Sequence, residues 1–447
     1  MTTASSPLTV AVIGSGVAGL AASWLLKRRH DVTLYERAAR LGGHCNTVDV
    51  SDANGNPVAI DTGFIVYNSV NYPNLVALFQ ALGVATHASD MSFAVSLDGG
   101  RLEYSGSDLG GLFAQRRNLV SPRFWRMLGD IARFYRAAPR LLAAADADTL
   151  TLGAYLDAEN YSAAFVDEHI LPMAAAIWSS AKADMRHYPA RDFVRFCANH
   201  GLLRLTRRPQ WRTVIGGSRV YVAKMSATLA DGVALGTAVR SVRRRHDGVT
   251  VEDDKGGVRR FDQVVIAAHA DEALAMLADA DPEERRLLGA FRYARKRAVL
   301  HSDASFMPVR RRAWASWNYL GRSGADGELP TVTYWMNNLQ KLTCQREFFV
   351  TLNPPREPRA AHAEFVYDHP GFDPRAGAAQ RELWSLQGRR RTWFCGAHFG
   401  AGFHEDGLQA GLAVAEDLGG VRRPWSVAEE SGRIWRTAAP VLSEAAE

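Results

Sequence analysis

The glycines and the acidic residue within the first forty positions have the spacing of a dinucleotide site. Gly14, Gly16 and Gly19 form a G-x-G-x-x-G pattern, and Glu36 follows about twenty residues later. The first glycine permits a tight turn, the second lets backbone approach a pyrophosphate, and the third lets helix and strand pack closely. Glu36 is then placed to accept hydrogen bonds from an adenosine ribose. The predicted dinucleotide-binding residues here are Gly14, Gly16, Val17, Ala18, Gly19, Glu36 and Arg37.

The residues around this pattern predict the strand-helix-strand unit that such a site requires. Residues 8–13 form a continuous apolar run, typical of a strand buried on both faces, and an Ala/Leu-rich helix follows through Arg28. Residues 31–36 form a second strand that ends in the carboxylate of Glu36. The helix N-terminus therefore faces the bound phosphates. A glycine-rich turn without a ligand is the alternative, which strand, helix and acid together disfavour.

A second glycine pair favours FAD over NAD. Arg40-Leu41-Gly42-Gly43 lies just past Glu36, where it would let backbone approach the long axis of an extended FAD. In residues and spacing, positions 10–43 resemble the flavoprotein superfamily that contains amine oxidases, protoporphyrinogen oxidase and phytoene desaturases. The resemblance implies FAD as the cofactor and adds Arg40, Leu41, Gly42 and Gly43 to its predicted site.

The segment from Trp393 to Gly411 looks like the C-terminal flavin-binding stretch of that superfamily. The resemblance implies that Gly396 lies by the ribityl chain, with Gly402, Phe403 and the turn through His404 to Gly407 beside the flavin ring. A helix N-terminus at this place would stabilise the negative charge that reduction puts near flavin N1. Members commonly carry an acid where this chain has Ala397, so we expect His398 or a backbone group to take over its hydrogen bond.

Two further segments resemble the superfamily in the middle of the chain. Gly216-Gly217 with residues 237–239 resembles the point of return to the FAD domain, which implies that Val239 meets the adenine. Asp61, Thr62 and Gly63 match a D-x-G element that implies a wall near the flavin. An equally weighted alternative is that Asp61 caps a turn.

A narrower resemblance points towards lipids. Residues 315–319, 334–340 and 403–407 are similar to a bacterial family of predicted NAD/FAD-binding proteins whose genes often neighbour cyclopropane-fatty-acid synthases. That association implies lipid chemistry. Three lysines, Lys224, Lys296 and Lys341, are available for the position that amine oxidases often use near flavin N5, but none lies in an identifying motif. This weakens the hypothesis of an amine oxidase.

The candidate catalytic residues are those that would orient a substrate or handle a proton, because a flavin accepts the hydride itself. His44 and the His404-Glu405 pair are the proton-handling candidates. The alternatives are that His44 is satisfied by backbone or flavin hydrogen bonds, and that His404 and Glu405 cap a helix and position the flavin. Tyr334 and Trp335 are expected either to line an apolar tunnel that ends at the flavin or to form ordinary sheet core.

The pattern of elements predicts an α/β fold, in which a discontinuous Rossmann-type FAD-binding domain is interleaved with an α+β substrate domain of antiparallel sheet and helices. Residues 1–70, 212–290 and 391–425 are predicted to form the FAD-binding domain. Residues 71–211 and 291–390 are predicted to form the substrate domain, followed by a C-terminal segment, 426–447. Within the predicted substrate domain, residues 75 to about 196 are expected to be mostly helical, and residues 300–353 are expected to form an antiparallel sheet.

Composition excludes several classes of protein. Of 447 residues, 47% are hydrophobic and 22% charged, which is typical of a globular protein rather than a disordered chain. The net charge of +6 comes from Arg clusters at 243–245, 310–312 and 389–391, most simply solvated turns, with an anionic-lipid surface as the alternative. No basic stripe with interleaved aromatic residues indicates a nucleic-acid partner. The 4 scattered cysteines indicate neither disulfides nor a metal site.

These observations predict a cytoplasmic enzyme, with contact at the inner face of the membrane left open. The short polar start, residues 1–7, is not expected to be a cleavable signal peptide. We expect an FAD-dependent oxidoreductase that exchanges a hydride with an apolar substrate, a fatty-acyl or related lipid, as a desaturase or isomerase. An amine oxidase that produces hydrogen peroxide and a non-catalytic flavin-holding partner protein are the alternatives. The oligomeric state stays open.

Overall fold

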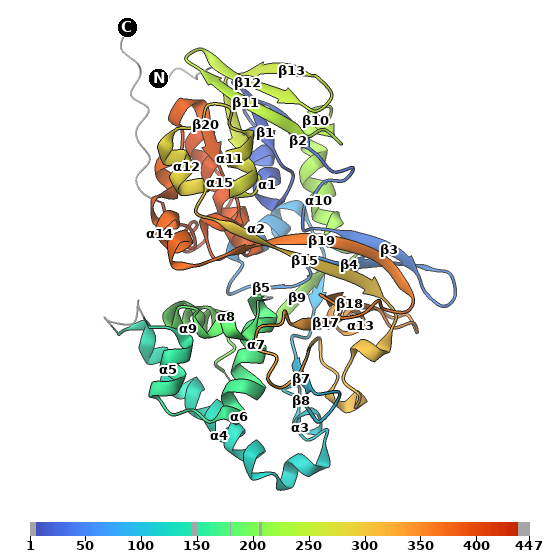
Figure 1. Ribbon diagram of the computed structural model, residues 1–447. Helices are drawn as coiled ribbons and strands as arrows, with labels where there is room; N and C mark the ends of the chain where they lie inside the picture. Colours follow the sequence, from blue (N-terminus) through green and yellow to red (C-terminus); the bar gives the residue numbers. More distant parts are fainter. Residues whose placement is uncertain (1–5, 145–149, 179, 205–207, 437–447) are drawn as a thin grey trace.

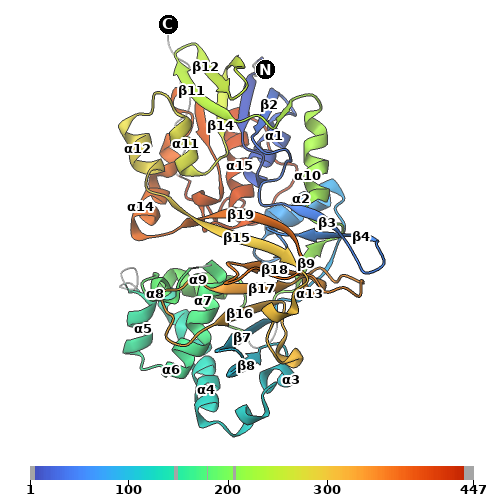
Figure 2. The same cartoon turned by 45° about the vertical axis from the view of Figure 1, so that its right-hand side comes forward.

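The computed structural model describes residues 6–144, 150–178, 180–204 and 208–436. Residues 1–5, part of the start that is not expected to be a signal peptide, lie outside this description. So do residues 437–447, at the end of the predicted C-terminal segment. Figures 1 and 2 show two halves, with a parallel sheet and its helices above, a second sheet with a helical region below, and long strands β15 (Arg292–His301) and β19 (Ala361–Gly371) between them.

The upper half is built on a five-stranded parallel sheet with the order β10-β2-β1-β14-β20. Its central strands are buried apolar runs, as a parallel sheet covered on both faces requires. The sheet joins strands from distant parts of the sequence: β1 (Thr9–Ile13), β2 (Asp31–Glu36), β10 (Val233–Leu235), β14 (Gln263–Ile266) and β20 (Thr392–Phe394).

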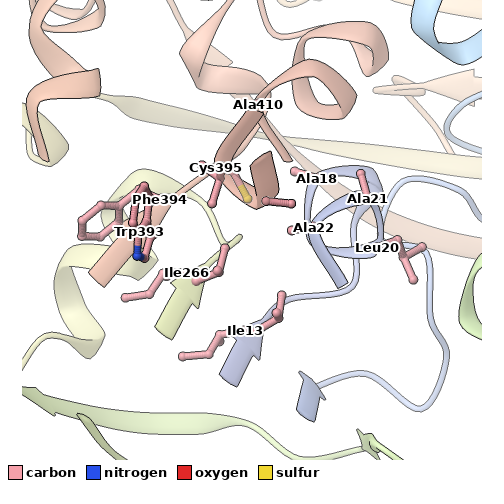
Figure 3. Close-up of a cluster of buried hydrophobic side chains, with 14 of the residues drawn as sticks. Ile13, Ala18, Leu20, Ala21, Ala22, Ile266, Trp393, Phe394, Cys395 and Ala410 are labelled. Atoms are coloured by element: carbon pink, nitrogen blue, oxygen red, sulfur yellow. The ribbon is translucent and has the colours of Figure 1, made fainter. Parts of the chain in front are cut away.

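Two helices from opposite ends of the chain pack together against this sheet. Helix α1 (Val17–Leu26) and helix α15 (His404–Gly419) are both almost entirely buried. Figure 3 shows Ala18 of α1 and Ala410 of α15 beside Ile13, Ile266 and Phe394 of three neighbouring strands. Small side chains line the helix contact, so that the two backbones approach closely.

Smaller elements complete the upper half. A three-stranded antiparallel sheet, β11-β12-β13, follows β10, and a two-stranded ribbon, β3-β4, leaves the first unit. Their bounds, with those of the nearby helices, are β3 (Thr47–Ser51), β4 (Pro57–Asp61), α10 (Arg219–Ser226), β11 (Val239–Arg245), β12 (Gly248–Asp253), β13 (Val258–Phe261), α11 (Ala270–Met276), α12 (Pro282–Leu288) and α14 (Pro374–Glu382).

The lower half contains a seven-stranded sheet with the order β19-β15-β18-β17-β16-β7-β8. Its inner strands are β16 (Trp317–Gly321), β17 (Thr331–Trp335) and β18 (Phe349–Leu352). The other elements of this half are β7 (Phe93–Leu97), β8 (Leu102–Ser105), α3 (Leu109–Leu112), α4 (Pro122–Ala137), α5 (Leu152–Ala158), α6 (Ala163–Phe165), α7 (Leu171–Trp178), α8 (Lys182–Arg186), α9 (Ala190–Asn199) and α13 (Met336–Leu339). A small sheet, β5-β9-β6, with helix α2 joins the halves: β5 (Tyr67–Asn68), α2 (Pro73–Leu82), β6 (Thr86–Ala88) and β9 (Trp211–Val214).

The α/β fold class, the strands of the first unit and the antiparallel pairing expected within residues 300–353 are confirmed, and two expectations need correction. The stretch from residue 75 to about 196 is not mostly helical at its start, because β6, β7 and β8 lie there and β7 is stabilised by pairing with the distant β16. That pairing is parallel, so the lower sheet is mixed rather than purely antiparallel. The domain boundaries themselves stay a prediction.

Within the described residues, no helix is both long and apolar enough to cross a membrane.

Because α1 and α15 are in close contact, we predict that position 411 does not tolerate a side chain. A Cβ atom there would lie 2.1 Å from the carbonyl oxygen of Ala18, and a backbone atom cannot give way as a flexible side chain can. We expect Gly411→Ala to lower the free energy of unfolding by about 3 kcal/mol or more, through overpacking, measured by chemical denaturation. Gly377→Ala on α14 is the matched control, because nothing lies within 4 Å of its added Cβ. Equal stability of both variants would contradict the prediction.

Candidate functional site

A cavity of about 820 Å³ connects the carboxyl edge of the parallel sheet with the N-terminus of α15. One end lies beside Glu36, Val239 and Glu272, and the other beside Phe64, Tyr367 and His404. Of the predicted site residues, those that line the cavity are Gly14, Gly16, Val17, Ala18, Glu36, Arg37, Arg40, Gly42, Gly43, His44, Gly63, Val239, Gly396, Gly402, Phe403, His404 and Gly407.

The glycine turn after β1 brings the N-terminus of α1 to the cavity. Gly14 adopts a left-handed φ of 99°, and a Cβ there would lie 2.7 Å from the carbonyl oxygen of Ala267. Gly16 is the N-cap of α1 and provides no side-chain cap. The first N–H groups of the helix therefore have no intrahelical acceptor, and they and the helix dipole favour an anionic group.

Glu36 both borders the cavity and holds the glycine turn. Its carboxylate accepts hydrogen bonds from the backbone N–H and the hydroxyl of Ser15, at 3.0 and 2.5 Å, and from the N–H of Ala38 at 2.8 Å. The Ser15 hydroxyl in turn accepts a bond from the N–H of Gly42 at 3.1 Å. Ser15 thus links both glycine segments to the acid, a role that the glycine pattern alone did not indicate.

Arg37 and Arg40 line the same wall of the cavity as Glu36 and the glycine turn. Arg40 donates to the carbonyl oxygen of Cys45 at 3.3 Å, beside the Gly42-Gly43 pair. Arg37 pairs with Glu272 of α11 at 2.6 Å, and both line the end of the cavity near Val239. A cation beside the N-terminus of α1 suits a diphosphate group.

The N-terminus of α15 borders the other end. Gly402, Phe403, His404 and Gly407 all line the cavity there. The backbone N–H of Phe403 donates to the Asp406 carboxylate at 2.7 Å, and Asp406 pairs with Arg433 at 2.5 Å. The first turn of α15 is thereby held rigidly, with its dipole directed at this end of the cavity.

His404 is the last member of a buried hydrogen-bonded chain. Its Nε2 lies 2.7 Å from the Tyr221 hydroxyl, and that hydroxyl lies 2.6 Å from the thiol of Cys45. The imidazole also stacks on Phe64, with ring centroids 3.8 Å apart. Tyr221 comes from α10, Cys45 from the segment before β3 and Phe64 from the segment after β4, so three separate segments fix the ring of His404 at the cavity wall.

A group of neutral histidines surrounds the same end of the cavity. The ring of His44 stacks on Tyr367 at 5.0 Å and lies 5.6 Å from His369. Burial lowers the pKa of His44, His398 and His404 to about 3, and that of His369 to about 4. These imidazoles are therefore uncharged near neutral pH. They can take part in hydrogen bonds but are poor proton donors.

Unpartnered nitrogen atoms test whether this wall fits a flavin. Nε2 of His44, Nδ1 of His369 and Nε2 of His398 are buried without a hydrogen-bond partner from the protein. Buried polar atoms are normally paired, so these three fit a wall whose remaining partners belong to a ligand. Helix N-termini at both ends, a cation beside one of them and polar atoms between them match the diphosphate, ribityl chain and ring of FAD. The fold and the site thus define an FAD-binding flavoprotein.

The comparison with known proteins gives the family. Residues 17–367 match the flavin containing amine oxidoreductases, and the chain belongs to this family of FAD-dependent oxidoreductases. It is 27% identical over 260 residues to the "Putative flavin-containing monoamine oxidase AofH" of Mycobacterium tuberculosis. That match covers 55% of this chain and 54% of the relative, so the chain spans about half the length of the curated relatives it matches.

Solved structures share the fold at low sequence identity. Wild-type putrescine oxidase bound to putrescine is 16% identical with a TM-score of 0.65, over 92% of this chain and 99% of that one. A CLA-producing fatty acid isomerase from P. acnes is 15% identical with a TM-score of 0.63, over 93% of this chain and 99% of that one. Cyclohexylamine oxidase from Brevibacterium oxydans is 18% identical with a TM-score of 0.65, over 92% and 99%.

Glu405 does not line the cavity, although the sequence analysis proposed it for proton handling. Its carboxylate accepts bonds from the backbone N–H groups of Asn74 and Leu75, each at 3.0 Å, and from the side-chain amides of Asn74 and Gln409. Glu405 therefore caps the N-terminus of α2, and the alternative of a capping role describes it. Its position one residue after His404 directs its side chain to a different neighbour.

Asp61 and Thr62 lie behind the cavity wall rather than on it. The Asp61 carboxylate accepts bonds from the backbone and hydroxyl of Ser218 and from the hydroxyl of Thr47 at 2.6 Å, so it holds the turn before α10. The Thr62 hydroxyl lies 2.7 Å from that of Tyr367 and so supports a residue that does line the cavity. Gly19 and Leu41 also pack behind the wall.

Tyr334 and Trp335 are not among the residues that line the cavity. Tyr334 packs edge-on against Trp317 at 4.8 Å, within the core of the lower sheet. Trp335 packs edge-on against Trp314, and the guanidinium of Arg311 lies 4.9 Å from its ring. The alternative of ordinary sheet core describes Tyr334, whereas Trp335 is only partly buried and packs against the exposed Arg311.

The sequence analysis missed several residues at the flavin end of the cavity. Tyr367 and His369 alternate on β19, and His269 stacks on Tyr293 at 4.3 Å after β14. All four line the cavity. The period-two alternation around Tyr367 was a usable signal for a strand, but nothing in the sequence tells which face of that strand meets the cavity.

The buried histidines predict a loss of stability in acid. In the unfolded chain a histidine titrates near its ordinary pKa of about 6.5, so below that pH the unfolded state binds protons that the folded state excludes. We expect the free energy of unfolding to fall from about pH 6.5 towards about pH 4. Burial raises the pKa of Asp61 to about 6, which offsets part of this loss.

The measurement is the melting temperature of the purified flavoprotein across this pH range. His369→Gln should flatten the pH dependence, whereas the same change at the exposed His246 should leave it unaltered. A stability that is constant down to about pH 4 would contradict the neutral state of these histidines.

The chain of Cys45, Tyr221 and His404 predicts a local effect of Tyr221→Phe. This change removes a hydroxyl that contacts two buried polar groups, so we expect a loss of about 1–3 kcal/mol in unfolding free energy. Because the ring of His404 is then no longer fixed, the visible absorption bands of bound flavin should shift as well. Tyr104→Phe is the control, since it also removes a buried bonded hydroxyl but lies away from the cavity. Equal spectral effects in both variants would contradict the positioning role of Tyr221.

Proposed function

We propose that the chain is an FAD-dependent oxidoreductase that exchanges a hydride with an uncharged apolar chain, a fatty-acyl or related lipid, as a desaturase or isomerase. The observation that carries this proposal is the chemical character of the flavin end of the cavity. Aromatic rings and imidazoles form that end, and the carboxylates around it are bound to other groups of the protein.

An aromatic layer connects this end with the helical region below. Phe403 lines the cavity and stacks on Phe196 of α9, with ring centroids 5.0 Å apart. Phe196 stacks on His200 at 3.9 Å, and His200 stacks on Trp211 at 6.0 Å. Such a layer of ring faces supports contact with hydrocarbon, since each apolar surface gains from being removed from water.

The acidic residues near this end are already engaged. Asp406 pairs with Arg433, Glu405 is bonded at the start of α2, and Asp61 is bonded to Ser218. Asp368 lines the cavity and lies 3.6 Å from Arg295. A cationic amine would need an available carboxylate or an equivalent anionic partner. This arrangement therefore favours an uncharged substrate over an ammonium ion.

The neutral histidines suit the same kind of reaction. When bound, FAD supplies a hydride acceptor and donor at the cavity. The protein then has to align the substrate chain, exclude water and provide hydrogen bonds for polar atoms of the wall. His404, held by Tyr221, and His44, stacked on Tyr367, are placed for such positioning, because both imidazoles are uncharged at neutral pH and lack the acidic proton of an imidazolium.

The comparisons support both this proposal and its rival. A fatty acid isomerase shares the fold, which supports a lipid substrate, but so do putrescine oxidase and cyclohexylamine oxidase. The family and the curated relative favour an amine substrate. An amine oxidase that forms hydrogen peroxide is accordingly the second candidate.

The test is the visible spectrum of the purified flavoprotein under anaerobic conditions. We expect the flavin bands to bleach on addition of fatty acids or membrane lipids in detergent, and to persist with putrescine, cyclohexylamine or benzylamine. Lipid chains that change double-bond position without lasting bleaching, followed by mass spectrometry, would indicate an isomerase. Bleaching by amines with peroxide formation in air would overturn the proposal in favour of the amine oxidase.

The aromatic layer supplies a variant for the same assay. Phe196→Ala should raise the lipid concentration needed for half-maximal bleaching about tenfold, because a large apolar contact is lost, while flavin remains bound. Phe93→Ala on β7 is the control, since Phe93 is also partly buried but lies in the seven-stranded sheet rather than on α9. An unchanged lipid response in Phe196→Ala would remove the aromatic layer from the substrate site.

A further inference from the structure

A group of large apolar side chains is exposed where α3 leads into α4. Leu109 is 76% exposed, Leu119 50%, Val120 82% and Trp125 51%. Figures 1 and 2 show this segment at the lower end of the molecule, far from the parallel sheet. Singly exposed apolar residues are common, but a cluster of this kind marks an interaction surface. We call residues 109–126 the tip segment.

Internal contacts hold the tip segment in this conformation. Trp125 donates its indole N–H to the carbonyl oxygen of Leu119 at 2.8 Å, and its ring packs against Phe113 at 5.6 Å. Asp108 caps α3 and Ser121 caps α4. The apolar side chains are therefore presented to solvent by a formed structure with capped helices, rather than by a loop that lacks contacts of its own.

The tip segment is basic as well as apolar. It contains Arg116, Arg117, Arg123 and Arg126, and no Asp or Glu occurs between residues 109 and 129. Arg123 pairs with Glu168 at 3.3 Å. Within the described part of the chain, Arg116, Arg117 and Arg126 are exposed and form no ion pair. Their charge is thus available to an anionic partner.

A second arginine cluster adjoins this segment. The carbonyl oxygen of Gly100 accepts one hydrogen bond from Gln115 of the tip segment and another from Arg310. Val309, next to Arg310, is 74% exposed. Arg310 and Arg311 pair with Glu103 and Glu347, whereas Arg312 is exposed. The apolar and cationic character of the tip therefore continues across the neighbouring turn.

We propose that the tip segment binds the surface of a bilayer that contains anionic lipids. Exposed Leu, Val and Trp side chains can enter the boundary between headgroups and acyl chains, where an indole is well accommodated. Arginines beside them would contact the anionic headgroups. Charge complementarity favours this partner over a second copy of the same basic surface. The proposal is independent of the substrate proposed above, since it rests on a different face of the molecule.

The test is flotation of the FAD-loaded full chain with vesicles of phosphatidylcholine alone or with added phosphatidylglycerol. We expect binding to the anionic vesicles, weaker binding at high salt, and little binding to neutral ones. R116E/R117E should lower the partition coefficient at least about 30-fold, since each arginine near an anionic surface contributes about fivefold. Val120→Ser should weaken binding to the same vesicles about tenfold, because an apolar contact is lost.

Control variants outside the tip segment distinguish its contribution to binding from the effects of net charge and of general hydrophobicity. R243E/R245E changes the charge by the same amount on exposed residues of β11, and Val258→Ser removes a side chain that is 64% exposed on β13. Both should bind anionic vesicles as the unmodified chain does. No binding to anionic vesicles, equal binding to neutral ones, or equal loss in R243E/R245E would each overturn the proposal. Concentration-dependent dimers that R116E/R117E abolishes, without vesicle binding, would replace the bilayer by a second copy.

Discussion

The structure depends on the close approach of α1 and α15 over the carboxyl edge of the parallel sheet. A Cβ at Gly411 of α15 would lie 2.1 Å from the carbonyl oxygen of Ala18 of α1. No side chain fits at such a position, so the backbones of the two helices are in direct contact. Because the two helices meet in this way, both N-termini face one cavity, one at the glycine turn and the other at Gly402 to His404.

This arrangement explains why the polar residues near the cavity divide into two roles. Glu36, Asp61 and Glu405 all hold turns or helix ends by accepting several hydrogen bonds each. They fix the backbone that forms the wall, and of the three only Glu36 also lines the cavity. The wall at the flavin end is then left to glycines, aromatic rings and histidines, three of which have a ring nitrogen without a partner in the protein. A rigid and nearly uncharged wall is suited to orienting a cofactor and a substrate rather than to acid-base catalysis.

The two ends of the molecule differ in chemical character. The upper half holds the cofactor cavity between buried helices, whereas the lower half ends in the exposed and basic tip segment (Figure 1). The seven-stranded sheet and the strands β15 and β19 connect these regions, and β19 contributes Tyr367 and His369 directly to the cavity. The chain thus combines a cofactor cavity in one half with an exposed basic surface in the other.

The sequence by itself determined the parts that local geometry dictates. The glycine spacing, the acid at the end of β2 and the buried strands around them indicated the FAD-binding unit, because each depends on neighbouring residues and on a turn that only glycine permits. Tertiary structure alone decided which side chains meet. Glu405 faces α2 while His404 faces the cavity, β7 pairs with the distant β16, and Tyr334 packs into a sheet rather than beside the flavin. The contact of Glu405 with α2 and the pairing of β7 with β16 join residues more than two hundred positions apart. A period of two or of 3.6 gives the faces of an element without telling what each face meets.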